Sequence, residues 1–241
     1  MKPYIERNLA EVRREVAEAE RAVGREGETL MLAAVKYAAE GEIEAMLDAG
    51  VTDVGENRVQ QLMANLALYE SRDVRVHFIG SLQTNKVKYI ASRVDVIHSL
   101  DSERLALEIE KRAAACGRVI DVLVEINSGR EASKSGVLPE EAAALCRVAL
   151  SLPHLHLAGF MTMGPVCESE EEYRTYFAET VALGRRLWRE IGAEGEPRFS
   201  MGMSQSFAAA IKEGATWVRV GRRLFAGRPE QPRNLTEIRN F

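Results

Sequence analysis

The first clear pattern in the chain is a stripe of apolar residues at helical spacing. Its members are separated by three or four positions, and they are Ile5, Leu9, Val12, Val16, Ala19 and Val23. Steps of this size place the side chains on one face of a helix, which can then be buried. Pro3 suits the first turn, and Gly24 and Gly27 suit a helix end. The pattern therefore predicts an N-terminal helix between Pro3 and Gly24.

After this segment, short apolar runs alternate with amphipathic stretches. The runs cover residues 30–35, 51–54, 74–79, 94–97, 119–126, 155–161, 198–201 and 216–220. The amphipathic stretches between them cover residues 42–49, 57–69, 85–91, 102–116, 140–150, 170–191 and 204–213. The runs are continuously apolar, which is typical of parallel strands buried on both faces. Regular alternation of strand and helix predicts parallel strands joined by right-handed crossovers.

Eight strand candidates in 241 residues give units of about 30 residues, the size of one strand and one helix. Eight such units close naturally into a (β/α)8 barrel of the TIM type, in the α/β class. The rival is an open, doubly wound sheet, which needs a glycine-rich turn after its first strand, and AAVKYAAEGE has none. We expect one domain over residues 1–241, with the N-terminal helix as an addition to the barrel. Gly227, Pro229 and Pro232 predict an irregular tail after about residue 228.

Several residues mark expected helix ends. Gly50, Gly117 and Gly214 stand where a helix would stop in the left-handed conformation. Ser169 is followed three positions later by Glu172, the spacing of a capping box. These signals support the predicted helix boundaries.

Composition narrows the possible functions. The hydrophobic fraction is 46%, the net charge is −4 and the pI is about 5.8, so we expect a globular protein that binds neither nucleic acid nor anionic membranes. Cys116, Cys146 and Cys167 are few and widely spaced, which favours a reducing compartment over a disulfide framework or zinc site. The charged N-terminal segment does not look like a secretory leader. We therefore expect a cytoplasmic protein.

In a parallel barrel, functional residues gather at the carboxyl ends of the strands. Lys36 directly follows the apolar run LAAV, so its side chain should begin inside the barrel. A lysine that is partly desolvated and near another cation is a good nucleophile toward a carbonyl group. The alternative is a lysine whose head simply reaches solvent. Lys36 alone does not decide between these interpretations.

The segment SMGMSQSFAAAIKEGATWVRVGRRLFAG adds a candidate anion site. Ser200 ends a strand, Gly202 turns the chain, and Ser204 is expected to open the next helix. The following strand carries Arg219 and Gly221. Each feature taken singly is explained by ordinary turns and caps. Together, after strands seven and eight of a barrel, they indicate a phosphate-binding site.

A lysine able to form a Schiff base, opposite a phosphate site in a barrel, is what pyridoxal 5′-phosphate requires. If Arg219 is the partner of the ring nitrogen, that nitrogen stays unprotonated and the cofactor is a weak electron sink. The stretch VRVG contains no acidic residue that would do the opposite. Strong carbanion chemistry is therefore not indicated.

The residues also carry a resemblance to a known family. The matching stretches are AAVK at 33–36, VGENRVQQ at 54–61, HFIGSLQTNK at 77–86, INSGREASKSGV at 126–137, GFMTM at 159–163, SMGMS at 200–204 and GATWVRVGRRLFAG at 214–227. In these stretches the chain resembles the YggS/PROSC family of pyridoxal phosphate homeostasis proteins, whose fold is similar to the barrel domain of bacterial alanine racemase. The stretches follow in order along nearly the whole chain.

This resemblance implies a set of cofactor-binding residues. They are Lys36 as the Schiff-base lysine, Arg219 near the ring nitrogen, Ser200, Met201, Ser204, Gly221 and Arg222 around the phosphate, and Asn57, His77 and Met161 along the pocket wall. Arg222 stands where many members have threonine, and a guanidinium suits a phosphate at least as well. The lysine is flanked by Val35 and Tyr37 where serine and threonine are common, and Ser206 replaces an acidic residue.

Three functions remain open at this point. The first is a carrier without catalysis, which holds pyridoxal phosphate, buffers the free aldehyde and passes it transiently to apo-enzymes. The second is a racemase-like enzyme, for which Tyr37 is the candidate second base, although the racemase's extra β-domain is not expected here. The third is a barrel for another phosphorylated ligand. We favour the carrier, and expect a monomer, with a dimer as the alternative.

A few other polar residues need an interpretation. His154 and His156 precede the core of their strand and lack an evident third ligand, so we interpret them as structural. His98 follows the fourth apolar run, where Asp101 and Ser102 more simply cap the next helix. Lys134 is either a rim charge or a second contact to the phosphate or aldehyde.

Overall fold

The computed structural model describes residues 2–131 and 134–229. Eight parallel strands close into a barrel in the order of the sequence, with β8 paired to β1. They are β1 (Leu30–Ala34), β2 (Asp53–Glu56), β3 (Arg75–Phe78), β4 (Val96–Leu100), β5 (Ile120–Glu125), β6 (Leu155–Met161), β7 (Arg198–Met203) and β8 (Trp217–Val220). The predicted (β/α)8 barrel is confirmed. The tail predicted after about residue 228 lies almost wholly outside the described residues.

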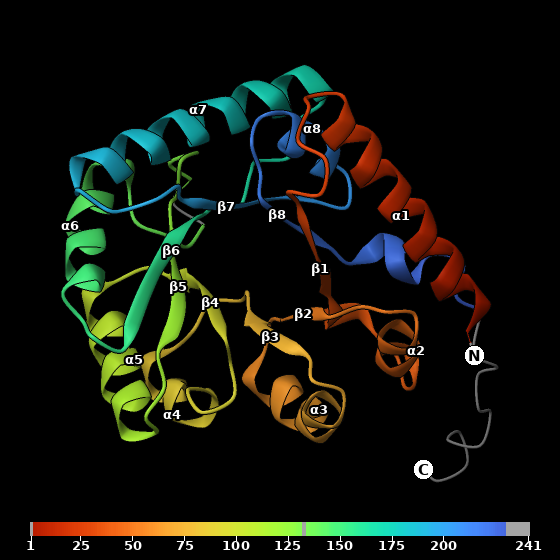
Figure 1. Cartoon of the computed structure of the whole chain (residues 1–241), viewed down its shortest axis with the longest axis horizontal. Helices are drawn as coiled ribbons and strands as arrows, with labels where there is room; N and C mark the ends of the chain where they lie inside the picture. Colours follow the sequence, from red (N-terminus) through yellow and green to blue (C-terminus); the bar gives the residue numbers. More distant parts are fainter. Residues whose placement is uncertain (1, 132–133, 230–241) are drawn as a thin grey trace, which may run out of the picture.

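Eight α-helices of the described residues surround the strands (Figure 1). They are α1 (Pro3–Arg21), α2 (Glu42–Asp48), α3 (Val59–Ser71), α4 (Val87–Ile90), α5 (Glu103–Ala115), α6 (Pro139–Leu150), α7 (Glu170–Glu190) and α8 (Phe207–Lys212). The described chain after β8 forms only a short 3-10 turn, η3 (Arg222–Phe225). Helix α1 packs against α8, η3 and α2, and thus fills the place in the ring that a helix after β8 would take (Figure 1).

The apolar stripe of α1 explains this position. Ile5, Leu9, Val12 and Val16 are buried in the main core, which lies between the strands and the helices. A second, small cluster consists of residues on the strands themselves, namely Val96, Leu123, Ala158, Met161 and Trp217. Alternate side chains of a strand point to opposite faces, so this second cluster lies inside the barrel. It leaves room there for polar side chains.

Near the functional site, the ends of β4 and β7 and the start of α8 differ from those expected. Strand β4 continues to Leu100, so His98 lies within a strand and not after it. Strand β7 continues through Gly202, whose φ of 87° lies in the left-handed region that glycine adopts without strain. Helix α8 therefore begins at Phe207, after the N-cap Ser206, and the expectation that Ser204 opens this helix is wrong.

Most expected helix ends are present. Gly50, Gly117 and Gly214 have φ angles of 78°, 65° and 109°, as predicted for left-handed helix stops. The hydroxyl oxygen of Ser169 accepts a hydrogen bond from the amide of Glu172 over 3.2 Å. The Glu172 carboxylate, however, accepts from the amide of Glu168, so only half of the predicted capping box forms.

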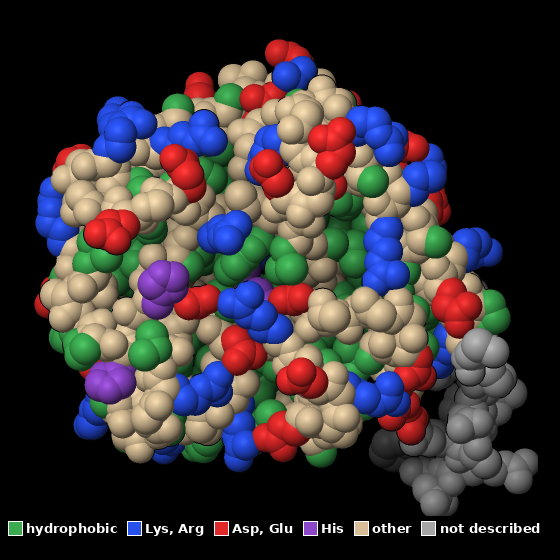
Figure 2. Space-filling view, in the orientation of Figure 1, with side chains coloured by type: hydrophobic (Ala, Val, Ile, Leu, Met, Phe, Trp, Pro, Cys, Tyr) green, Lys and Arg blue, Asp and Glu red, His purple; other side chains and the backbone are tan. Residues whose placement is uncertain are grey.

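The surface of the described residues mixes both signs of charge. Figure 2 shows Lys and Arg side chains interspersed with Asp and Glu, and no large area of one sign on the visible face. Within these residues, no helix combines the length and apolarity that a bilayer crossing requires. The three cysteines are not joined in disulfides.

Candidate functional site

A cavity of about 390 Å³ opens at the carboxyl ends of the strands, where function was expected. Its size suits a small organic ligand. The lining residues are Ala34, Lys36, Tyr37, Asn57, Ile79, Gly80, Ser81, Glu125, Lys134, Ser135, Met163, Met203, Ser204, Arg219, Gly221 and Arg222. Six of the predicted site residues are therefore brought together: Lys36, Asn57, Ser204, Arg219, Gly221 and Arg222.

Lys36 reaches the cavity from a short turn. Strand β1 ends at Ala34, and the 3-10 turn η1 (Val35–Tyr37) follows it. Val35 is fully buried and anchors the turn, while Lys36 is exposed to the cavity mouth. The Lys36 ammonium lies 4.8 Å from the centre of the Tyr37 ring. The amine thus stands at the rim of the cavity, within reach of a bound ligand.

A second set of contacts holds this turn from outside the barrel. Arg228 donates through Nη2 to the carbonyl oxygen of Tyr37 over 2.6 Å and through Nε to Glu42 over 2.7 Å. The carboxylate of Glu42 also accepts from the hydroxyl of Tyr4 and from the amide of Ala39, each over 2.5 Å. These bonds tie the chain after β8, and Tyr4 of α1, to the residues that directly follow Lys36.

Arg219 lies on the floor of the cavity and is 4% exposed. Its Nη1 donates to the carbonyl and hydroxyl oxygens of Ser200 over 2.7 and 2.6 Å. Its Nη2 donates to the carbonyl oxygen of Thr162 over 2.9 Å and to the sulfur of Met163 over 3.4 Å. These four bonds match the four Nη hydrogens, which leaves the Nε–H without an acceptor among the described residues.

The guanidinium of Arg219 carries a positive charge at neutral pH. Burial lowers its pKa to about 10, while the nearby charge of Glu125 acts in the opposite direction. A pKa of about 10 is still far above neutrality. The cavity floor therefore offers one N–H donor from a charged group.

The loops after β7 and β8 form a tight cradle next to this floor. The amide of Gly221 donates to the hydroxyl oxygen of Ser204 over 3.2 Å, so the Ser204 hydroxyl hydrogen points elsewhere. A Cβ at Gly221 would lie 3.0 Å from the carbonyl oxygen of Ala34, and a Cβ at Gly202 would lie 2.6 Å from the Cβ of Ala210. Gly221 and Ser204 thus create a close backbone approach with Arg222 beside it on the cavity wall, whereas Gly202 lets β7 pack against α8.

Asn57 adds an unused acceptor to the same cavity. Its Oδ1 is buried and has no hydrogen-bond partner among the described residues. Gly80 lies directly against it, because a Cβ there would come within 2.2 Å of the Asn57 carbonyl oxygen. A buried polar atom without a partner is unfavourable unless a ligand or solvent satisfies it. The cavity thus offers an anion cradle at Ser204 and Gly221, a charged donor at Arg219 and a free acceptor at Asn57. Together these groups fit a small ring compound that carries a phosphate.

Glu125 lines the cavity but was not predicted from the sequence. It ends β5, is 4% exposed and lines the cavity. Burial and the nearby charge of Asp101 raise its pKa to about 7, against the effect of Arg219. The available signal was a carboxylate within the apolar run VLVEIN, where a charged side chain needs a reason.

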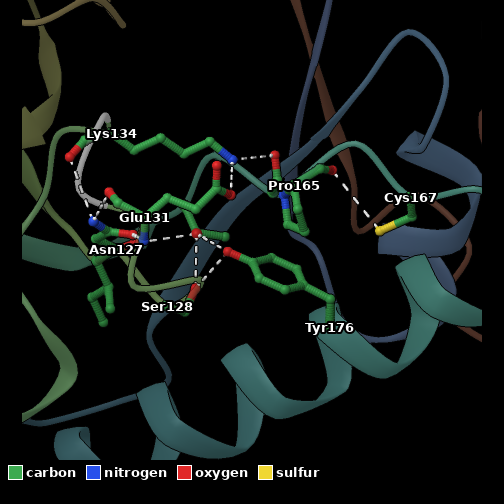
Figure 3. A network of polar contacts seen from close by, with 10 residues as sticks. Asn127, Ser128, Glu131, Lys134, Pro165, Cys167 and Tyr176 are labelled. Atoms are coloured by element: carbon green, nitrogen blue, oxygen red, sulfur yellow. Dashed lines mark hydrogen bonds and ion pairs between the residues drawn. The ribbon is translucent and has the colours of Figure 1, made fainter.

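Lys134 lines the cavity from the loop after β5. Its ammonium donates to the carboxylate of Glu131 over 2.5 Å and to the carbonyl oxygen of Gly164 over 3.3 Å (Figure 3). Asn127 and Ser128 hold the base of the same loop, and Ser128 bonds to Tyr176 of α7 over 2.6 Å (Figure 3). Lys134 is thus an ion-paired rim residue in this structure.

Four predicted site residues do not line the cavity. His77, Met161 and Ser200 lie inside the barrel below it, where His77 and Ser200 are fully buried and Met161 belongs to the interior cluster. Met201 points the opposite way, into the main core between strands and helices. The reason is the alternation of strand side chains: only residues near the strand ends, on the inward face, reach the mouth.

His154 and His156 have structural contacts, as predicted. His154 bonds to Glu110 over 2.7 Å, and His156 bonds to Asp121 over 2.8 Å. The described residues contain no group of three or more His, Cys, Asp or Glu that could hold a metal ion. The hydroxyl oxygen of Ser102 accepts from the amide of Leu105 and caps α5, as predicted.

Comparison with known proteins places these residues in context. Residues 7–229 match the family described as the N-terminal domain of alanine racemase. The pyridoxal phosphate homeostasis protein of Aquifex aeolicus is 43% identical over 198 residues, 82% of this chain and 86% of the relative. The protein of the same name from Pseudomonas aeruginosa is 35% identical over 226 residues, 93% of this chain and 96% of the relative.

Solved structures agree with the fold. A crystal structure from Bifidobacterium adolescentis has a TM-score of 0.82 at 35% identity, covering 93% of this chain and 95% of that one. PipY of Synechococcus elongatus, solved with PLP bound, has a TM-score of 0.77 at 28% identity, covering 87% of this chain and 99% of PipY. The chain belongs to the family of pyridoxal phosphate homeostasis proteins, within the alanine racemase N-terminal domain family.

Proposed function

We propose that this protein binds pyridoxal 5′-phosphate in the cavity at the strand ends, with Lys36 joined to it as a Schiff base. The observation that carries the proposal is that Lys36, Arg219 and the Ser204–Gly221 cradle line one cavity. Pyridoxal phosphate has three polar groups that need partners: the aldehyde, the ring nitrogen and the phosphate. Lys36, Arg219 and the cradle supply an amine, a charged donor and an anion site for them. Relatives named for pyridoxal phosphate homeostasis support the same assignment.

The chemistry required of the chain is simple. Lys36 would supply the amine and pyridoxal phosphate the aldehyde, and their condensation would form a carbon–nitrogen double bond with release of one water molecule. The reaction is reversible by addition of water, so a bound aldehyde can later be released. The position of Lys36 at the exposed rim allows water and acceptor amines to reach that bond.

The phosphate would lie in the cradle. The Ser204 hydroxyl, whose oxygen already accepts from Gly221, has its hydrogen free to donate to a phosphate oxygen. Arg222, on the same wall, supplies a positive charge with fixed fork geometry. Ser200, which was expected at the phosphate, lies below the cavity and bonds to Arg219, so we assign the phosphate to Ser204 and Arg222 instead.

Arg219 favours storage of the cofactor over catalysis. Its Nε–H would donate to the ring nitrogen, and a guanidinium cannot at the same time protonate that nitrogen. A neutral ring withdraws electrons weakly, so proton loss from a bound amino acid is not promoted. The proposed role is therefore to hold and buffer the reactive aldehyde and to pass it to apo-enzymes.

A racemase-like activity is the second candidate, and Tyr37 is the observation that favours it. Tyr37 lines the cavity and lies against the Lys36 ammonium. If Tyr37 acts as a second base, the protein interconverts the D- and L-forms of an amino acid, and Tyr37→Phe abolishes that turnover while pyridoxal phosphate still binds. The carrier function predicts no sustained turnover in either protein.

Titration with pyridoxal phosphate tests the proposal. The purified protein, stripped of bound aldehyde, should gain a visible absorption band on addition of pyridoxal phosphate. Lys36→Ala should not gain this band, whereas Lys134→Ala, a matched change of a lysine on the same cavity wall, should gain it. The proposal is overturned if the unaltered protein gains no band or if Lys36→Ala gains the same one.

A further inference from the structure

A continuous line of polar side chains crosses the barrel interior. His77 Nε2 lies 3.0 Å from Asp53 Oδ1, and His77 Nδ1 lies 2.9 Å from His98 Nε2. His98 Nδ1 lies 2.9 Å from the hydroxyl oxygen of Ser200, which accepts from Arg219 over 2.6 Å. None of the five residues is more than 6% exposed. Asp53 is the first residue of β2, so the line runs from the amino end of the strands to the cavity floor.

The residues at the two ends of the line determine which atom carries each hydrogen between them. The Asp53 carboxylate can only accept, and the Arg219 guanidinium can only donate. Burial lowers the pKa of His77, partly opposed by Asp53, and lowers the pKa of His98 still further. Both imidazoles are therefore neutral and carry one ring hydrogen each.

Only one arrangement satisfies all four bonds. His77 must donate from Nε2 to Asp53, so its Nδ1 accepts from Nε2 of His98. His98 Nδ1 then accepts from the hydroxyl of Ser200. The lone pairs of Ser200 are thereby left to accept from Arg219. Every bond points the same way, from the guanidinium to the carboxylate.

We propose that this relay, from Asp53 through two buried imidazoles, positions Arg219 from the opposite end of the barrel. The relay is defined as Asp53, His77, His98 and Ser200. Its imidazoles cannot turn freely, because the Trp217 ring lies 5.3 Å from His77 and 5.2 Å from His98, measured between ring centres. The Ser200 hydroxyl is therefore directed away from Arg219, and its oxygen holds Nη1 in place.

The relay residues are positioning residues, since only Arg219 lines the cavity. As a consequence, both Nη atoms of Arg219 remain hydrogen-bonded to protein acceptors, and its Nε–H remains free to donate to a ligand. A chain of hydrogen bonds inside a low-dielectric core strengthens each member, so a charge at one end is felt at the other. Polar side chains that merely filled the barrel interior, without a continuous chain of hydrogen bonds, would not carry the effect of the Asp53 charge to Arg219.

The first test uses the native protein without ligand and does not depend on the proposed function. Nitrogen-15 NMR of the imidazole rings reports which nitrogen carries the hydrogen. The relay requires His77 and His98 to be neutral with the hydrogen on Nε2. A hydrogen on Nδ1 of either ring, or a charged ring at neutral pH, overturns the proposal.

The second test rests on pyridoxal phosphate binding and measures coupling at a distance. Asp53→Asn removes the accepting charge and keeps the side-chain size, and should weaken binding of pyridoxal phosphate about threefold to tenfold. In an Arg219→Gln background the same change should have no further effect, because distant sites are coupled only through the relay. Equal losses in both backgrounds, or no loss in either, contradict it.

Asp121→Asn is the matched control for this cycle. Asp121 is also a carboxylate near the amino ends of the strands, but its hydrogen bonds go to Arg75 and His156 and to none of the four relay residues. Its substitution should leave binding unchanged in both backgrounds. A loss equal to that of Asp53→Asn would mean that any charge change at this end acts on the cavity, and would overturn the relay.

Discussion

The amide of Gly221 donates a hydrogen bond to the hydroxyl oxygen of Ser204 and so joins the loops after β7 and β8. The bond uses the serine oxygen as an acceptor and leaves the hydroxyl hydrogen free to donate to a ligand. Ser204→Ala should weaken pyridoxal phosphate binding about tenfold, because a phosphate oxygen loses a charge-assisted hydrogen bond. Inorganic phosphate should also compete less strongly with pyridoxal phosphate in Ser204→Ala than in the unaltered protein, as measured by a binding titration. Ser151→Ala, at the exposed end of α6, is the control, and an unchanged affinity in Ser204→Ala would remove this serine from the phosphate site.

Glu125 predicts an unusual dependence of stability on pH. Its folded-state pKa of about 7 is above the ordinary value of 4.5, so the folded protein holds this proton more tightly than the unfolded chain. Stability from this group is therefore present below pH 4.5, falls as pH rises to about 7, and stays lower above it.

Glu125→Gln cannot ionise and should be more stable than the unaltered protein at pH 8 by about 1–3 kcal/mol, with a much smaller difference at pH 5. Urea unfolding of the unliganded protein at the two pH values measures this. A stability difference that is the same at both would show that Glu125 does not titrate in this range.

The Glu42–Arg228 contact predicts the opposite behaviour in acid. Burial alone would raise the pKa of Glu42, but hydrogen bonds from Arg228 and Tyr4 outweigh it, and the pKa is lowered below its ordinary value of 4.5. The stabilising effect of the ionised group is present above pH 4.5 and is lost as pH falls through the folded pKa.

Thermal unfolding between pH 6 and pH 3.5 tests this contact. Glu42→Gln should lower the melting temperature at pH 6 and reduce its fall toward pH 3.5, because the variant has no carboxylate to protonate. Glu140→Gln, which breaks an exposed pair with Arg130, should change little. Parallel melting curves for Glu42→Gln and the unaltered protein over the whole range would contradict the prediction.

Gly80 belongs to the loop after β3 and lies directly against the backbone of Asn57. A Cβ at this position would overlap the Asn57 carbonyl oxygen at 2.2 Å, and backbone must move to relieve it. Gly80→Ala should cost about 1–3 kcal/mol of unfolding free energy and weaken pyridoxal phosphate binding, since Asn57 lines the cavity. Gly129→Ala, whose Cβ meets only a flexible Glu131 side chain at 3.4 Å, is the control. Equal stability of the two variants would show that the backbone at Asn57 yields without cost.

Features set by the local sequence were predicted well. The continuous apolar runs and the glycines after the helices define the barrel, because each depends on residues only a few positions apart. Lys36, Arg219 and Gly221 were predicted to lie together because each stands at or beside a strand end, and the three line one cavity. The family resemblance added Asn57 and Arg222.

What the sequence could not predict depends on packing between distant elements. His77 and Ser200 lie below the cavity because β3 and β7 direct them into the barrel, and their contact through His98 spans more than 100 positions of the chain. The place of α1 in the ring depends on the chain after β8, which forms only a short turn among the described residues, so that α1 packs against α8 and that turn. Neither relationship leaves a periodic signal.

Reduction of the complex with borohydride, followed by peptide mapping, tests the central claim most directly. Hydride converts the double bond between lysine and cofactor into a stable amine, so the modified lysine can be located by mass spectrometry. The account predicts one modified peptide, the one containing Lys36, and its loss in Lys36→Ala. A stoichiometric adduct on Lys134 or another lysine, with Lys36 unmodified, would contradict it.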